Sequence, residues 1–99
     1  MIYKIQTRSA FEFELREIIY FYKKINQKLA KQFLIRLKEA KQYLIDNPKG
    51  FEIRYKNARQ IELKKFPYLI QYFINESEKT VYLIAITHSH NNPSDYTLR

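Results

Sequence analysis

The 99-residue sequence predicts an α+β fold, with an N-terminal strand and an antiparallel pair of helices packed on a mostly antiparallel sheet of four to five strands. Three observations lead to this class. Residues 9–46 place apolar side chains at helical spacing, whereas the segments after Gly50 alternate with the period of a strand. The composition, with 45% hydrophobic residues and one glycine, is typical of a packed protein. The length predicts that residues 1–99 form one domain.

The N-terminal part is predicted to form one strand and two helices. Residues 2–7 alternate in hydrophobicity, which indicates a short strand. Ser9 and Glu12 fit a capping box at the start of the first helix, because each side chain would satisfy a free backbone N–H. A polar break at residues 25–28 is short enough to make the second helix an antiparallel neighbour, which Pro48 ends.

Four segments in the second half have the character of strands: 51–55, 59–66, 68–74 and 81–88. In the second of these, Ile61 and Leu63 face one side while Glu62 faces the other. The last two segments are apolar on nearly both faces, which is typical of central strands. Pro67 falls between two strands, where its missing N–H costs no ladder bond.

The composition also excludes several classes of protein and site. With no cysteine, the chain has no disulfide, no thiolate metal site and no cysteine nucleophile. No segment is apolar enough for a signal peptide or a membrane span, so we expect a cytoplasmic protein. The formal net charge of +8, concentrated in residues 1–50, favours an acidic partner, either a nucleic acid or a protein.

Three stretches in the predicted order resemble the RelE/ParE superfamily of bacterial toxins from type II toxin–antitoxin modules. LAKQFLIRLKEAKQYLIDNPKG resembles the second helix of that family, with its helix-stopping proline. ARQIELKKFPYLIQYFI is similar to the ParE-like pattern of an arginine, a short strand, Phe-Pro-Tyr and a buried strand containing tyrosine. VYLIAITHSHNNPSDY resembles the last strand and its terminal histidine. The resemblance covers nearly the whole chain and implies a toxin with a RelE/ParE-like fold.

The resemblance implies one of two activities, since RelE-like members cut mRNA in the ribosome and ParE-like members inhibit DNA gyrase. Ribonuclease members carry basic side chains on outward-facing strand positions, which correspond here to Gln60, Glu62 and Leu69. Asn91 stands where many relatives have an arginine. A carboxylate at position 62 would repel the scissile phosphate, so the expected activity is ParE-like inhibition of gyrase, without catalysis. A non-toxic, degenerate binding module is a further alternative.

Candidate residues follow for each activity. A ribonuclease would have to use His88 as its acid or base and Lys64 and Arg59 for charge. Tyr96 could stack on a base of the RNA. The resemblance implies these target-binding residues for a gyrase inhibitor: Arg59, Tyr68, His88, Tyr96 and Arg99. A structural role for Arg59, paired with the C-terminal tail or with a strand-end carbonyl, is an open alternative. His88 and His90 lack a third ligand, so we expect no metal site and no cofactor.

The resemblance also implies a cognate antitoxin whose acidic segment folds as it wraps the toxin. The basic side chains around the predicted helix junction would attract such a segment: Lys23, Lys24, Lys28, Lys31 and Arg36. Direct DNA binding by this chain is not expected, because such modules normally place it in the antitoxin.

Overall fold

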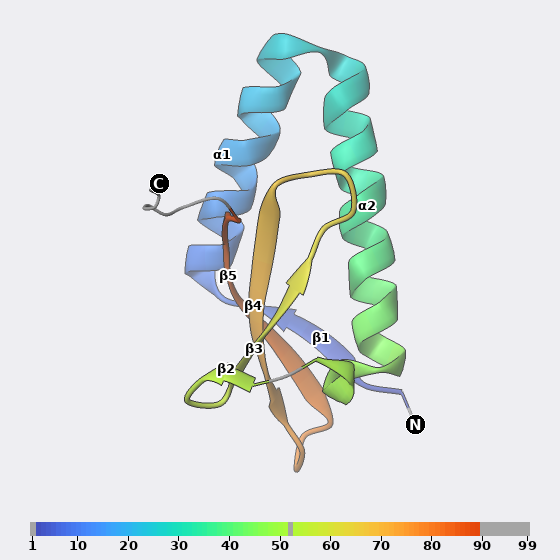
Figure 1. The fold of residues 1–99 in the computed structure, drawn as a ribbon, viewed down its shortest axis with the longest axis vertical. Helices are drawn as coiled ribbons and strands as arrows, with labels where there is room; N and C mark the ends of the chain where they lie inside the picture. The colour runs from blue at the N-terminus through green and yellow to red at the C-terminus, as the bar shows by residue number, and fades with distance from the viewer. Residues whose placement is uncertain (1, 52, 90–99) are drawn as a thin grey trace.

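A computed structural model describes residues 2–51 and 53–89, and it contains two helices and a five-stranded sheet (Figure 1). The elements are β1 (Lys4–Thr7), α1 (Ser9–Ile25), α2 (Gln27–Asp46), the 3-10 turn η1 (Pro48–Gly50), β2 (Ile53–Tyr55), β3 (Ala58–Glu62), β4 (Tyr68–Asn75) and β5 (Thr80–His88). The predicted fold class is confirmed, and each predicted strand is present, although β1, β2 and β3 are shorter than the segments that predicted them.

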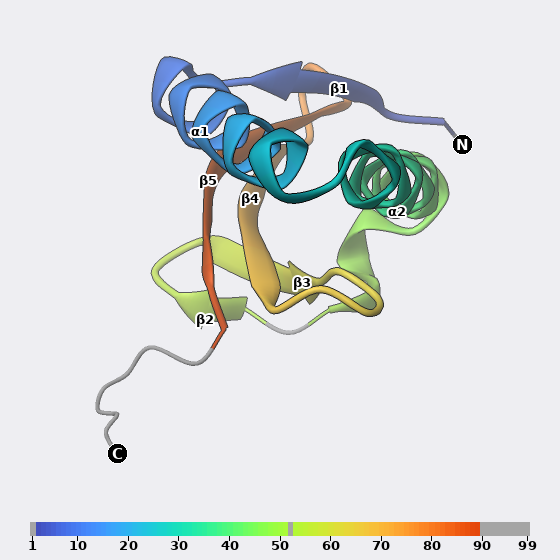
Figure 2. The ribbon, with the colours of Figure 1, turned by 90° about the horizontal axis from the view of Figure 1, so that it is seen from above.

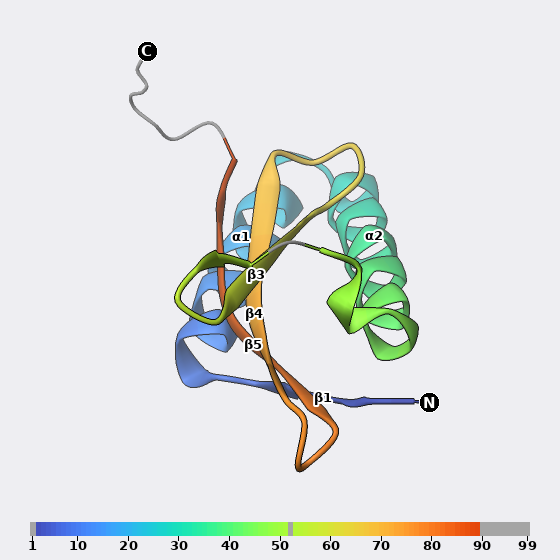
Figure 3. The same ribbon diagram turned by 60° about the horizontal axis from the view of Figure 1, so that its bottom comes forward.

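The strand order is β1-β5-β4-β3-β2, so β4 lies at the centre of the sheet. β1 runs parallel to β5, with Lys4 opposite Thr80, whereas the other neighbouring strands are antiparallel. The tip of the β4–β5 hairpin projects beyond the other elements, and it is the orange segment in Figure 3. The register between β4 and β5 shifts between Gln71 and Tyr72, a bulge of the kind that bends and twists a hairpin.

Both helices lie on the same face of the sheet, between β1 and β3 when they are viewed along their axes (Figure 2). The apolar stripe of α2 is buried against the sheet, and it consists of Ala30, Phe33, Leu37, Ala40 and Leu44. On the sheet, the residues of the predicted inner face pack against this stripe. Ile61 and Leu63 are both buried there, as the alternation predicts. Four aromatic rings converge at one end of this core: Tyr22, Phe33, Phe66 and Tyr68.

The predicted capping box at the start of α1 is wrong. Ser9 is already inside the helix, Arg8 occupies the N-cap position, and no side chain caps it. Glu12 instead accepts a hydrogen bond from the hydroxyl of Thr7 at 2.7 Å. β1 runs directly into α1, so the hydroxyl that the carboxylate reaches is the one at the end of the strand.

The break between the helices is a single residue, shorter than the four that the sequence predicts. The N–H of Asn26 donates to the carbonyl of Tyr22 and so ends α1. Its side-chain oxygen accepts the N–H of Lys28 at 2.7 Å and so begins α2. One asparagine therefore satisfies free backbone groups of both helices, which makes the hairpin tight.

Candidate functional site

The outer face of the sheet, which points away from the helices, brings together the positions that the sequence analysis compared with a ribonuclease. Glu62 of β3 lies opposite Leu69 of β4, and Gln60 lies opposite Gln71. Their neighbours Ile61 and Ile70 point into the core, because successive residues of a strand alternate between faces. Glu62 is exposed to solvent.

Three neutral polar side chains cross this outer face and satisfy one another. The amide nitrogen of Gln71 donates to the side-chain oxygen of Gln60 at 3.0 Å and to the hydroxyl of Thr87 at 3.2 Å. These side chains come from β3, β4 and β5 in turn. The central part of the outer face is therefore polar but uncharged, and its hydrogen-bonding groups are already engaged with one another.

An aromatic cluster occupies the outer face beside this ladder of three polar side chains. Phe73 and Tyr82 stack with their ring centroids 5.0 Å apart, and the guanidinium of Arg8 lies 5.3 Å and 4.8 Å from those centroids. The Tyr82 hydroxyl donates to Glu78, which raises the pKa of Tyr82. Sequence reasoning did not identify this cluster, although the alternation of β4 and the hairpin register contain the signal for it.

A hollow of about 370 Å³ borders the aromatic cluster. Its walls consist of Phe73, Ile84 and Ala58 together with Lys56 and Asn57. It therefore presents apolar atoms beside two polar residues, on a part of the sheet that no described helix covers. Such a surface is suited to the side chains of another protein.

Arg59 has a structural role. Its guanidinium donates to the backbone carbonyls of Phe51 and Lys49, on either side of the end of η1. These carbonyls belong to η1 and to the residue after it rather than to the end of a strand. The bonds hold the connection between α2 and β2 against β3. Lys64, the other cation proposed for a ribonuclease, is exposed just beyond the end of β3.

Tyr68 and His88 lie together at one end of the sheet, where β4 begins and β5 ends. The Tyr68 ring is buried, with 7% of its surface exposed, and it meets the exposed His88 ring edge-on at a centroid distance of 4.9 Å. Burial raises the pKa of Tyr68 to about 12, and the neighbouring Tyr22 adds to the shift. The buried Tyr68 ring therefore supports the exposed ring of His88. Its role in target binding stays a prediction.

The other predicted site residues divide into two groups. Tyr96 and Arg99, together with His90 and Asn91, lie outside the described residues, and their roles stay predictions. The predicted antitoxin-binding lysines surround the junction of α1 and α2 and are all exposed: Lys23, Lys24, Lys28 and Lys31. Arg36 lies further along α2, where it is partly buried and paired with Glu39 at 3.1 Å.

Nowhere in residues 2–51 and 53–89 do three histidine or acidic side chains come close enough to hold a metal ion. No helix in the same residues is long and apolar enough to cross a membrane.

Comparison with known proteins agrees with this architecture. A family model described as the ParE toxin of the type II toxin–antitoxin system parDE matches residues 5–93. No curated protein sequence matches the chain.

Three solved structures share the fold. A chain of the chromosomal ParDE toxin–antitoxin system of P. aeruginosa has a TM-score of 0.72 at 14% identity, over 88% of this chain and 96% of that chain. The intact RelBE complex of E. coli gives 0.63 at 17%, over 87% and 95%. The isolated RelE toxin of E. coli gives 0.64 at 15%, over 95% and 92%. Because the family match spans nearly the whole chain, the chain belongs to the ParE toxin family, within the RelE/ParE superfamily of type II toxin–antitoxin systems.

Proposed function

We propose that this chain inhibits DNA gyrase through direct protein–protein contact and that a cognate antitoxin neutralises it. The observation that carries the proposal is the chemistry of the outer face of the sheet. Glu62 and Leu69 stand there at positions where ribonuclease relatives are expected to be basic. RNA cleavage needs cations beside the scissile phosphate, since negative charge develops on it, and a carboxylate in that place would repel it.

The rest of the outer face supports contact with a protein rather than cleavage of RNA. The ladder of Gln60, Gln71 and Thr87 carries no charge, and its groups are satisfied among themselves. The hollow beside Phe73 and Ile84 offers apolar area that an incoming protein side chain would fill. The ladder supplies no acid, base or cation for phosphate chemistry, and Lys56 is the one charged residue that lines the hollow.

The RelE-like alternative, a ribosome-dependent mRNA endoribonuclease, would depend on the end of the sheet. His88 is exposed there as a candidate acid or base, and Lys64 is an exposed cation beyond β3. The third source of charge in that alternative, Arg59, donates to two backbone carbonyls. Among the described candidates, only Lys64 is then a cation without another partner. One cation gives little stabilisation to the negative charge of a phosphorane.

The antitoxin is the second partner in the proposal. The RelE toxin of E. coli was crystallised in complex with RelB, its antitoxin. By analogy, a protein encoded next to this chain would bind it and prevent contact with gyrase. The exposed lysines at the helix junction would raise its rate of association if its binding segment is acidic.

The test combines expression with two biochemical assays. Expressed alone in a bacterial host, the chain is expected to arrest growth, and the neighbouring open reading frame is expected to restore growth. The purified chain is expected to inhibit supercoiling by DNA gyrase and to leave mRNA intact in a translating ribosome mixture. Ribosome-dependent cleavage that is lost in His88→Ala would contradict the proposal and establish the RelE-like alternative. Expression without any growth arrest would indicate a degenerate binding module.

A further inference from the structure

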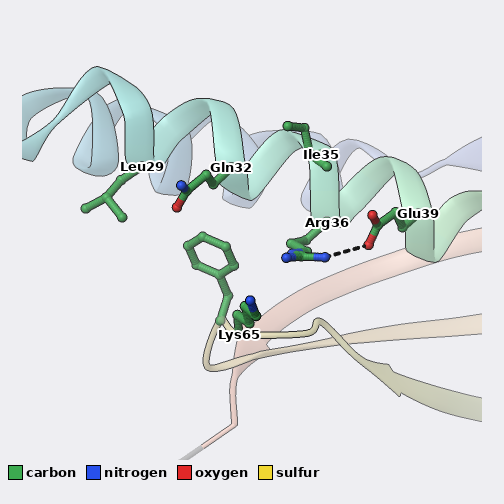
Figure 4. Close-up of a pocket in the computed structure, with 7 residues that line it drawn as sticks. Leu29, Gln32, Ile35, Arg36, Glu39 and Lys65 are labelled. Atoms are coloured by element: carbon green, nitrogen blue, oxygen red, sulfur yellow. Dashed lines mark hydrogen bonds and ion pairs between the residues drawn. The ribbon is translucent and has the colours of Figure 1, made fainter.

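A continuous groove runs along α2, between this helix and the segment from β3 to the start of β4. One hollow of about 350 Å³ lies between α2 and the turn that contains Lys65 and Phe66 (Figure 4). A second hollow of about 560 Å³ continues along α2 to Tyr43 and reaches Glu62 on β3. The two hollows share Arg36 and Glu39 and so form one surface, the α2–β3 groove.

Large apolar side chains line the helix side of the groove and contact solvent. Ile35 has 55% of its surface exposed and Tyr43 has 49%. They belong to the same side of α2 as Gln32 and Glu39, because residues three, four and seven apart share a helical face. Covering them with apolar atoms of a partner would remove this area from water, which favours association.

The strand side of the groove is an open sheet edge. The pairing of β3 with β2 ends where Arg59 meets Ile53, and no strand of the described residues pairs with that edge beyond this point. The N–H of Leu63 donates to the carbonyl of Tyr68, on the β4 side. Backbone groups alternate along an antiparallel strand, so those of Glu62 point the other way, into the groove. An edge of this kind accepts a further strand.

The charges at the groove favour an acidic occupant. Arg36 and Glu39 are paired with each other, as Figure 4 shows, so their charges largely offset. Lys64 and Lys65 are exposed on the strand side, and neither has an ion-pair partner among the described residues. Glu62 is the one carboxylate left to oppose them, which leaves positive charge for a partner to neutralise.

We propose that the α2–β3 groove binds an extended, acidic segment of the antitoxin, which adds as a strand to the open edge of β3. The inference rests on the antitoxin of the proposed function and specifies where and in what conformation it binds. The part of α2 from Leu29 to Tyr43 is about 21 Å long, at about 1.5 Å per residue. This length accommodates about six residues of a strand. Side chains on one face of that strand cover Ile35 and Tyr43, and carboxylates meet Lys64 and Lys65.

The first experiment measures binding of the purified product of the neighbouring open reading frame. The double variant Ile35→Ser with Tyr43→Ala is expected to raise the dissociation constant about tenfold or more, because both side chains would be central to the contact. Both residues are half exposed in the free chain, so the variant keeps the core. Leu34→Ser is the matched control, since Leu34 is 41% exposed on α2 and does not line the groove, and it is expected to bind within about twofold of the wild type.

A second pair of variants tests the added strand. Glu62→Pro removes the N–H that points into the groove and leaves the β4 side of the ladder intact, whereas Glu62→Gln changes only the charge. We expect weaker binding for the proline variant alone, and slower hydrogen exchange of the Glu62 amide when the partner binds the wild type. Circular dichroism of each variant confirms that the fold is retained.

The outcomes separate the two proposals. A partner that binds the wild type and all groove variants equally, with no protection of the Glu62 amide, would overturn the groove assignment and leave the toxin–antitoxin pair standing. A neighbouring product that does not bind the wild type at all would contradict both. Sedimentation of the chain alone completes the test, because a dimer that Glu62→Pro dissociates would assign the edge to a second copy and overturn the inference.

Discussion

The side chain of Tyr72 links the central strand of the sheet to the turn that follows α2. Its ring is fully buried in β4, and its hydroxyl donates to the carbonyl of Pro48 at 2.7 Å. Burial raises the pKa of Tyr72 to about 12, so the phenol stays neutral and remains a donor. A buried hydroxyl is tolerated only with a partner, and here that partner is the first residue of the turn after α2.

We expect Tyr72→Phe to lower the free energy of unfolding by about 1–2 kcal/mol, since the ring volume is kept while the buried carbonyl of Pro48 loses its donor. Urea unfolding followed by circular dichroism measures the change. Tyr43→Phe is the control, because the Tyr43 ring is half exposed, and it is expected to stay within about 0.5 kcal/mol of the wild type. Equal effects of both substitutions would show that the Pro48 bond contributes nothing.

At the scale of elements, α1 supports β5 along the part of its edge where no strand of residues 2–51 and 53–89 pairs with it. The pairing of β1 with β5 ends at Thr7 and Leu83, and the register of β5 against β4 shifts at about the same point. Past this point the N–H of Ile86 donates to the carboxylate of Glu14 at 2.9 Å. A helix side chain thus replaces the missing strand as the partner of a partly buried backbone group.

Glu14→Ala is expected to lower the free energy of unfolding by about 1–3 kcal/mol, because it leaves the Ile86 N–H without an acceptor. Glu14→Gln keeps an oxygen in place and is expected to lose less. Hydrogen exchange at the Ile86 amide measures the effect at the site, and urea unfolding measures it globally. An amide that exchanges at the same rate in the alanine variant would refute this role for Glu14.

The same elements show how far the sequence predicts the structure. Alternation placed Ile61 and Leu63 in the core and Glu62 on the outer face, because the side-chain period of a strand is fixed by its backbone. The predicted helix start is wrong because Ser9 and Glu12 have the spacing of a capping box, whereas the Glu12 carboxylate accepts the hydroxyl of Thr7, which only the path of β1 places beside it. The bond from Ile86 to Glu14 and the carbonyl partners of Arg59 join distant segments, and no local pattern contains them.

At the scale of the whole molecule, Glu76 connects three segments that are far apart in the sequence. Its carboxylate accepts hydrogen bonds from the Tyr3 hydroxyl at 3.1 Å and from the Lys79 ammonium at 3.0 Å, and it pairs with Lys49 at 2.8 Å. These residues come from the N-terminal segment, the β4–β5 turn and η1. The bond to Lys49, followed by the one to Lys79, lowers the pKa of Glu76 to about 2.

This shift makes part of the stability dependent on pH. The folded state holds the Glu76 pKa at about 2, below its ordinary value of 4.5, so the contribution is complete above pH 4.5 and is lost as the pH falls towards 2. Glu76→Gln is therefore expected to lower the urea midpoint at pH 7 and to leave it unchanged near pH 2. Glu17→Gln, which alters an exposed carboxylate on α1, is the control. A midpoint difference that persists at pH 2 would contradict the linkage.

The parallel pairing of β1 with β5 has a consequence for how the chain is made. β1 leaves the ribosomal exit tunnel before any other strand, yet Thr80–Leu83, its partners, are synthesised after all the remaining strands. A nascent chain can form the helical hairpin early, because its contacts are local, but the sheet has to wait for its most distant pairing. Any surface that this sheet presents to a target is therefore absent during most of the chain's own synthesis.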